Sequence, residues 1–181
     1  MAANDPNTLA QPPQGGVGWL APGALDERLA EEISRAERYG TQLSCLLVVI
    51  DNLEEMAREH GSELREQTLG YVAGALQREL RRFDRIGRPS DGELVIVLPG
   101  ADGPRGEMVA RRVLDRLRAI KVEASGTRRP LRVSVGLAAW QDGSSGEDLL
   151  SRSRSASRAG GGGEEARVGT HSPPPLGRDH I

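Results

Sequence analysis

Arg81 and Asp84, three residues apart, form the pair with the clearest capacity to bind a ligand. Arginine offers a planar fork of N–H donors to a phosphate group, and aspartate accepts hydrogen bonds from N–H groups. At helical spacing both side chains would face one surface, and Arg78 and Arg85 would add positive potential. The alternative is that these arginines form a solvated surface and that Asp84 marks the turn into the next strand.

Metal-site and redox patterns are missing from this sequence. Cys45 is the only cysteine, and within the apolar run 43–50 it should behave as a small buried hydrophobe. His60 stands beside Gly61 without a neighbouring ligand, and paired Cys or His residues at metal-ligand spacing do not occur. We therefore expect no metal ligands and no resident cofactor.

Length and charge narrow the class of protein. The 181 residues suit one domain with tails, and the net charge of −2 argues against a nucleic-acid partner. No apolar run approaches the roughly 20 residues that span a bilayer, so no membrane partner is expected. The first residues lack the charged-then-apolar pattern of a secretory signal, and a cytoplasmic location is expected.

The hydrophobic pattern predicts alternating helices and strands. Apolar residues at helical spacing predict helices over 25–36, 69–83 and 109–120. Residues 53–60 are a short polar helix candidate that ends before Gly61, and a last helix opens at 146. Apolar or alternating runs predict strands over 43–50, 85–88, 94–98 and 131–137. The turn residues of 89–92 predict a hairpin between the second and third strands. This order predicts an α+β fold with helices packed on a mostly antiparallel sheet.

The two ends of the chain differ in composition from its middle. Residues 1–16 are rich in Pro, Gln and Asn, and residues 160–181 contain a run of four glycines and three consecutive prolines. Both segments are predicted to be flexible, with one domain over 17–159. The stretch 151–158 alternates serine and arginine, which predicts either a frayed basic helix end or a phosphorylated or acid-binding segment.

The element order and several local sequences resemble the GGDEF (diguanylate cyclase-like) domain of bacterial cyclic di-GMP signalling. Leu46–Asp51 resembles the family's first strand, which usually ends Asp-Ile-Asp. Leu94–Pro99 resembles the strand after the signature hairpin, and Val133–Ala138 the late strand. The resemblance covers about residues 18–158 and implies a palm-like, mostly antiparallel sheet flanked by helices, as in nucleotide cyclases.

The resemblance also implies where the cyclase chemistry should be. Two carboxylates that hold a divalent metal in the family align with Val49 and Gly92, and neither residue has a side chain that can ligate a metal. The signature Gly-Gly-Asp-Glu-Phe reads Ser-Asp-Gly-Glu-Leu over 90–94. Asp51 and Glu93 survive, either in a polar role or as strand-end and hairpin carboxylates. The expectation is a pseudoenzyme without catalytic residues; the alternative is a cyclase with residual activity.

The surviving ligand motif is the family's Arg-x-x-Asp inhibitory site, which the resemblance places at Arg81 and Asp84, six residues before Ser90. In the family this pair binds cyclic di-GMP. The family's guanine-reading Asn and Asp align near Ala57 and Glu66. We therefore expect a non-catalytic signalling module whose partners are cyclic di-GMP, another protein or a second copy of the chain. A third alternative is a structural or dimerising domain that binds no nucleotide.

Overall fold

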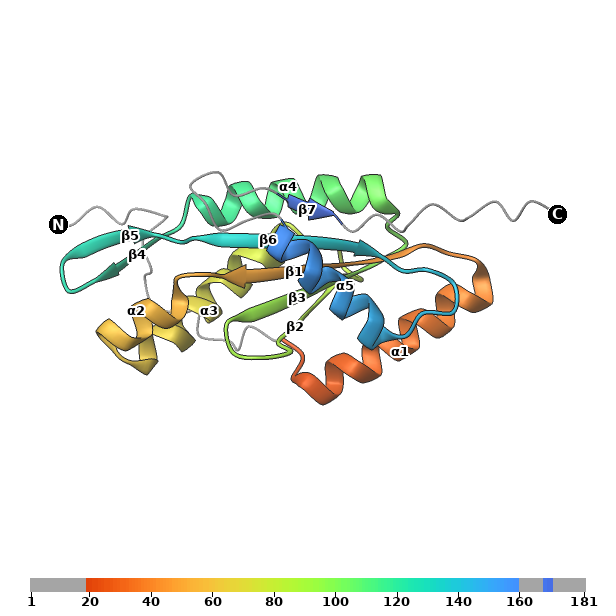
Figure 1. The fold of residues 1–181 in the computed structure, drawn as a ribbon, viewed down its shortest axis with the longest axis horizontal. Helices are drawn as coiled ribbons and strands as arrows, with labels where there is room; N and C mark the ends of the chain where they lie inside the picture. Colours follow the sequence, from red (N-terminus) through yellow and green to blue (C-terminus); the bar gives the residue numbers. More distant parts are fainter. Residues whose placement is uncertain (1–18, 160–167, 171–181) are drawn as a thin grey trace.

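A five-stranded sheet in the order β2-β3-β1-β6-β7 forms the centre of the molecule (Figure 1). The computed structural model describes residues 19–159 and 168–170. The strands are β1 (Leu43–Ile50), β2 (Arg85–Gly87), β3 (Glu93–Pro99), β6 (Val133–Ala139) and β7 (Val168–Thr170). All neighbours pair antiparallel except β7, which runs parallel to β6. The predicted α+β class, the mostly antiparallel sheet and the hairpin of β2 and β3 are confirmed.

Five helices flank this sheet in two layers. They are α1 (Pro22–Tyr39), α2 (Leu53–His60), α3 (Ser62–Gln77), α4 (Gly103–Arg118) and α5 (Gly146–Ala159). Buried residues of α2, α3 and α4 form one apolar cluster with the sheet, and those of α1 and α5 form a second cluster. Figure 1 shows α5 crossing in front of the strands. Among the described residues, no helix is both long and apolar enough to cross a bilayer.

The side chains on the two faces of β1 pack against different layers of helices, because successive strand residues point to opposite sides of a sheet. Leu46, Val48 and Ile50 pack in the cluster with α3 and α4. Cys45, Leu47 and Val49 face the α1 and α5 layer. The continuous apolar run that predicted a strand buried on both faces is thereby explained.

Helix α3 ends earlier than its apolar pattern predicted. The helix stops at Gln77, and turns occupy most of residues 78–84. Phe83, predicted to lie on the buried helix face, is 69% exposed. The prediction of a helix to residue 83 was wrong, because Asp84 accepts a hydrogen bond from the Arg81 backbone N–H and so closes a local turn.

Three further features differ from the predictions. A separate hairpin of β4 (Lys121–Ala124) and β5 (Thr127–Pro130) was not predicted, and Figure 1 shows it extending beyond one end of the sheet. Helix α5 continues to Ala159 instead of fraying from 151, because it packs on β6. Strand β7 lies within the segment 160–181 that was predicted to be flexible. Residues 1–16 and the rest of 160–181 lie outside the described residues.

Candidate functional site

A row of three side chains crosses the sheet near the end of β1. Val49 is paired with Glu93 on β3 and with Ser134 on β6. Directly paired residues of antiparallel strands have Cβ atoms about 4.5–5.5 Å apart, so the row is continuous. It lies on the face covered by α5, and Asp51 follows β1 at the same end.

This row forms the floor of a pocket of about 400 Å³, which we call the sheet-end pocket. Its lining combines two carboxylates, two guanidinium groups, two serine hydroxyls and one apolar side chain. The lining residues are Val49, Asp51, Glu93, Ser134, Arg154, Ser157 and Arg158. The cations all come from α5, and the carboxylates come from the ends of β1 and β3.

Helix α5 reaches this position because β6 carries a glycine where the two elements meet. A Cβ atom on Gly136 would overlap the carbonyl oxygen of Ser153 and the backbone nitrogen of Ser157. Only a residue without a side chain allows this approach. One helical turn of α5 is therefore held directly over the sheet, with Arg154 at the pocket.

Both carboxylates of the sheet-end pocket already have partners. The Glu93 carboxylate accepts from Arg154, with nitrogen–oxygen distances of 3.2–3.3 Å, and from the Ser90 hydroxyl at 2.8 Å. Asp51 accepts from the Ser134 hydroxyl at 2.6 Å. The Glu93 side chain is 19% exposed and that of Arg154 is 36% exposed. The pocket is thus cross-linked by an ion pair and hydroxyl bonds.

The turn between β2 and β3 has no free acid aimed into the pocket. Gly92 has a φ of 80°, which favours glycine, and the exposed Asp91 accepts from Arg88 at 2.9 Å. Neither Val49 nor Gly92 has a side-chain atom that could bind a divalent cation. Within residues 19–159 and 168–170, no group of three or more His, Cys, Asp or Glu is placed to hold a metal. The side chains present do not fit the metal site that the family resemblance implies.

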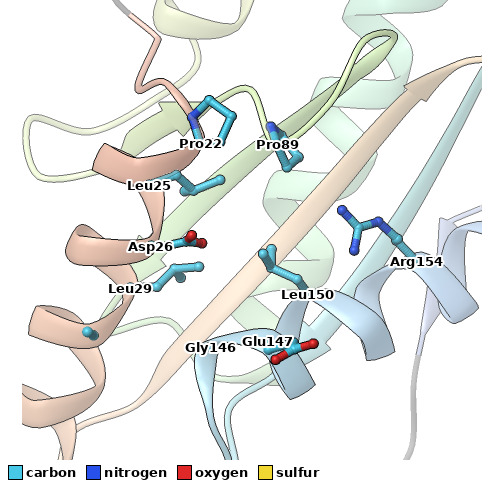
Figure 2. A pocket seen from close by; sticks show the side chains of 10 residues that line it. Pro22, Leu25, Asp26, Leu29, Pro89, Gly146, Glu147, Leu150 and Arg154 are labelled. Carbon is cyan, nitrogen blue, oxygen red and sulfur yellow. The ribbon is translucent and has the colours of Figure 1, made fainter.

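A second pocket, of about 460 Å³, lies between α1, α5 and Pro89 of the β2–β3 turn. Leu25 and Leu29 line it from α1, and Glu147 and Leu150 line it from α5. Figure 2 shows Arg154 reaching from α5 toward the strands at one side of this pocket. Arg154 lines both this pocket and the sheet-end pocket.

Ala57 and Glu66, which align near the family's guanine-binding Asn and Asp, have different surroundings from each other. Ala57 is buried in α2 and has no polar side chain. Glu66 on α3 accepts two hydrogen bonds from Arg88, at 2.8 and 2.9 Å, and Arg88 also stacks over Trp19 at 5.3 Å. The bond from Arg88 lowers the pKa of Glu66, and the same bond raises the pKa of Arg88. Arg88 therefore ties α3 to the β2–β3 turn.

The Arg81–Asp84 turn has a different organisation from the predicted helical face. Asp84 is buried, with 9% exposure, and its Oδ2 accepts from the Arg81 backbone N–H at 2.8 Å. The Arg81 side chain is exposed. Arg85 donates to the carbonyl oxygens of Arg82 and Asp84. The structure brings Arg81 and Asp84 together through the Arg81 backbone N–H, and Asp84 lies at the turn into β2.

Arg154 is the site residue that sequence reasoning missed. The alternating Ser and Arg residues of 151–158 predict either a frayed helix end or a phosphorylated or acid-binding segment, and nothing local indicates which arginine faces the sheet. A usable signal was helical spacing. Leu150, Ser153 and Ser157 lie at intervals of three and four, and all three are buried. Arg154 sits beside this buried stripe.

Comparisons with known proteins agree with this geometry. The family model for the diguanylate cyclase GGDEF domain matches residues 23–161. The diguanylate cyclase DgcP of Pseudomonas aeruginosa is 28% identical over 133 residues, which cover 74% of this chain and 20% of that protein. The chain therefore spans about a fifth of the length of that relative.

Solved structures share the fold. The GGDEF domain of DgcB from Caulobacter crescentus, in complex with cyclic di-GMP, aligns with a TM-score of 0.78 at 20% identity, covering 86% of this chain and 94% of that one. The diguanylate cyclase SiaD from Pseudomonas aeruginosa, in complex with its activator SiaC, aligns with a TM-score of 0.75 at 23% identity, covering 83% and 58%. With the family model matching most of its length, this chain belongs to the diguanylate cyclase GGDEF-domain family.

Proposed function

We propose that this chain is a degenerate, non-catalytic GGDEF signalling module that binds cyclic di-GMP and acts through a protein partner or a second copy of itself. One observation carries the loss of catalysis. In the row that crosses the sheet, Glu93 faces Val49 and Ser134, so it is the only carboxylate among three paired positions. The family resemblance implies a metal-binding acid where Val49 stands.

Cyclisation joins a sugar hydroxyl to an α-phosphate, and divalent metal neutralises the charge that develops at phosphorus. Hard carboxylate oxygens in near-octahedral geometry are what Mg²⁺ requires. Here Val49 and Gly92 supply none, while Asp51 and Glu93 are bonded to Ser134 and Arg154. Losing charge stabilisation of this kind typically raises a barrier by several kcal/mol.

The proposed ligand site is the Arg81–Asp84 turn. The exposed Arg81 guanidinium is available to a phosphate or a guanine edge. Asp84 uses Oδ2 for the turn, and a carboxylate has further lone pairs to offer a guanine. The ligand in the DgcB structure and the activator in the SiaD structure support cyclic di-GMP and a protein as partner classes.

A cyclase assay tests the loss of catalysis. Purified protein with GTP and Mg²⁺ or Mn²⁺ should give no cyclic di-GMP by chromatography. Turnover that disappears in Glu93→Gln or Asp51→Asn would overturn the proposal. It would instead support the second candidate, a cyclase with residual activity, which is favoured by one observation: both acids line the sheet-end pocket.

Calorimetry with cyclic di-GMP, with and without Mg²⁺, tests the ligand site. Binding should not need Mg²⁺, and Arg81→Ala should weaken it about tenfold to hundredfold, because a charged hydrogen bond contributes roughly 1.5–3 kcal/mol. Arg111→Ala on α4 is the matched control, since Arg111 is 71% exposed and pairs with Glu107. No binding at high micromolar ligand would leave a protein-interaction module only.

A further inference from the structure

Glu93 forms an ion pair with Arg154, a residue of the same chain. Arg154 contacts both carboxylate oxygens of Glu93, Oε1 and Oε2, and the Ser90 hydroxyl takes a further position on Oε2. These contacts take lone pairs on both carboxylate oxygens, so a metal ion at Glu93 would compete with them. The ion pair is also only partly exposed, so water screens it less than a surface pair.

The formal charges of the sheet-end pocket are balanced without any ion. Asp51 and Glu93 bring two negative charges, and Arg154 and Arg158 bring two positive ones. A divalent cation beside Glu93 would stand next to a fixed guanidinium, and like charges at such range repel. To bind there, the metal must displace Arg154.

Displacement of Arg154 is opposed by the way α5 is seated. The helix backbone rests against Gly136. The Ser157 hydroxyl donates to the carbonyl oxygen of Arg154, and the Ser153 hydroxyl donates to that of Leu149. Arg154 is therefore presented to Glu93 by a turn of helix that cannot easily shift along the sheet.

We propose that the Arg154 guanidinium is the fixed counter-charge of Glu93 in place of a divalent cation, so that the sheet-end pocket excludes Mg²⁺ and Mn²⁺ while Arg154 is present. This inference deepens the proposed function and rests on it, because both concern the same pocket. It goes further by assigning the exclusion of metal to a residue outside the signature hairpin.

Thermal unfolding of the nucleotide-free chain in a Mn²⁺ titration tests this proposal. The wild-type midpoint should stay constant. In Arg154→Gln, Glu93 loses its guanidinium partner and becomes available to a metal beside Asp51, and the midpoint should rise by about 3–6 °C when Mn²⁺ is ten times its dissociation constant. The rise should vanish in Arg154→Gln/Glu93→Gln. Arg158→Gln removes the same charge from the same pocket but not from Glu93, and should not respond.

Three results would overturn the proposal: a wild-type midpoint that Mn²⁺ raises and Glu93→Gln abolishes, a folded Arg154→Gln that does not respond, or an equal response in Arg158→Gln. The effect of Mn²⁺ on the wild-type midpoint tests the proposal even if Arg154→Gln does not fold. Mn²⁺ binding by the wild-type chain without GTP turnover would refute this inference and leave the proposed function standing. Turnover of GTP would refute the proposed function itself.

Discussion

At the sheet-end pocket, two carboxylates, two guanidinium groups and two serine hydroxyls still face one another, although Val49 and Gly92 replace the acids that the family resemblance implies. At the Arg81–Asp84 turn, both motif residues are present, yet the acid is buried and bonds to the backbone of its own partner. One region lacks the motif and keeps a charged pocket. The other keeps both motif residues, but one of them, Asp84, closes a turn of the backbone. A motif and the site it usually marks are therefore separate properties.

The difference follows from what each region contributes to the fold. Val49 and Glu93 lie at the ends of strands whose register is set by the apolar residues before and after them. Changing an acid at such an end leaves the register intact. Asp84 closes the turn that leads from α3 into β2, so losing it would alter the backbone. Retention of Asp84 has a structural reason whether or not a ligand binds.

The largest expected effect comes from a substitution that displaces α5. It should disturb the sheet-end pocket and leave the Arg81–Asp84 turn unchanged. Gly136→Ala should destabilise the chain by about 3 kcal/mol, at the upper end for overpacking, because the new methyl group overlaps the helix backbone. Gly70→Ala in α3 is the control: its Cβ would meet nothing within 4 Å, and a gain of roughly 0.5–1 kcal/mol is expected. Chemical denaturation measures both.

Cys45 gives that experiment a second readout. Burial raises the pKa of this thiol to about 12, so the folded wild-type protein should resist thiol reagents near neutral pH. Because α5 packs over this part of β1, displacement of α5 in Gly136→Ala should speed labelling. Cyclic di-GMP binding at the Arg81–Asp84 turn should stay unchanged. Loss of that binding in a folded Gly136→Ala would show that the two regions are coupled.

Asp84 should matter for both stability and ligand binding, whereas Arg81 should matter for ligand binding alone. Asp84→Ala leaves the Arg81 backbone N–H without its acceptor and should cost about 1–2 kcal/mol of unfolding free energy. Asp84→Asn keeps an acceptor oxygen and should cost less. Arg81→Ala, at an exposed side chain, should stay within about 0.5 kcal/mol of wild type. Equal losses in Asp84→Ala and Arg81→Ala by urea denaturation would contradict this division.

A smaller effect is expected from restoring an acid at the sheet end. Val49→Asp places a carboxylate directly opposite Glu93, and like charges in paired positions destabilise a sheet by roughly 0.2–1 kcal/mol. Val49→Asn is the control, since it has nearly the same shape without the charge. The difference between the two variants should shrink as salt is added. No difference at low salt would mean that Arg154 neutralises both acids.

The smallest effect concerns Glu66, whose pKa is lowered chiefly by the hydrogen bond from Arg88. A lowered folded pKa means that the pair stabilises the chain above the unfolded pKa of Glu66. That contribution is lost as pH falls through the folded value. The stability difference between wild type and Glu66→Gln should therefore narrow in urea denaturation as pH falls from above the ordinary Glu pKa through the lowered folded pKa. The Glu66 side chain is 56% exposed, so the difference should be small at every pH.

Prediction from sequence succeeded where the signal is local. The apolar run of β1 and the helical periods of α1 and α4 were recognised because each pattern reports its own burial. It failed at Phe83, where an apolar residue at helical spacing is 69% exposed because the chain turns first. The β4–β5 hairpin was also missed, since β4 alternates polar and apolar residues over only four positions and β5 is polar and largely exposed.

The sequence by itself determined the α+β class, the β2–β3 hairpin and the absence of side-chain donors at Val49 and Gly92, because residue type and period are properties of the chain. Only the tertiary structure decided which groups meet. Glu93 and Arg154 are 61 residues apart in the chain, and Asp51 and Ser134 are 83 apart. Sheet register and the close seating of α5 on Gly136 bring them together. Local pattern does not encode such long-range contacts, since they depend on how separate elements pack.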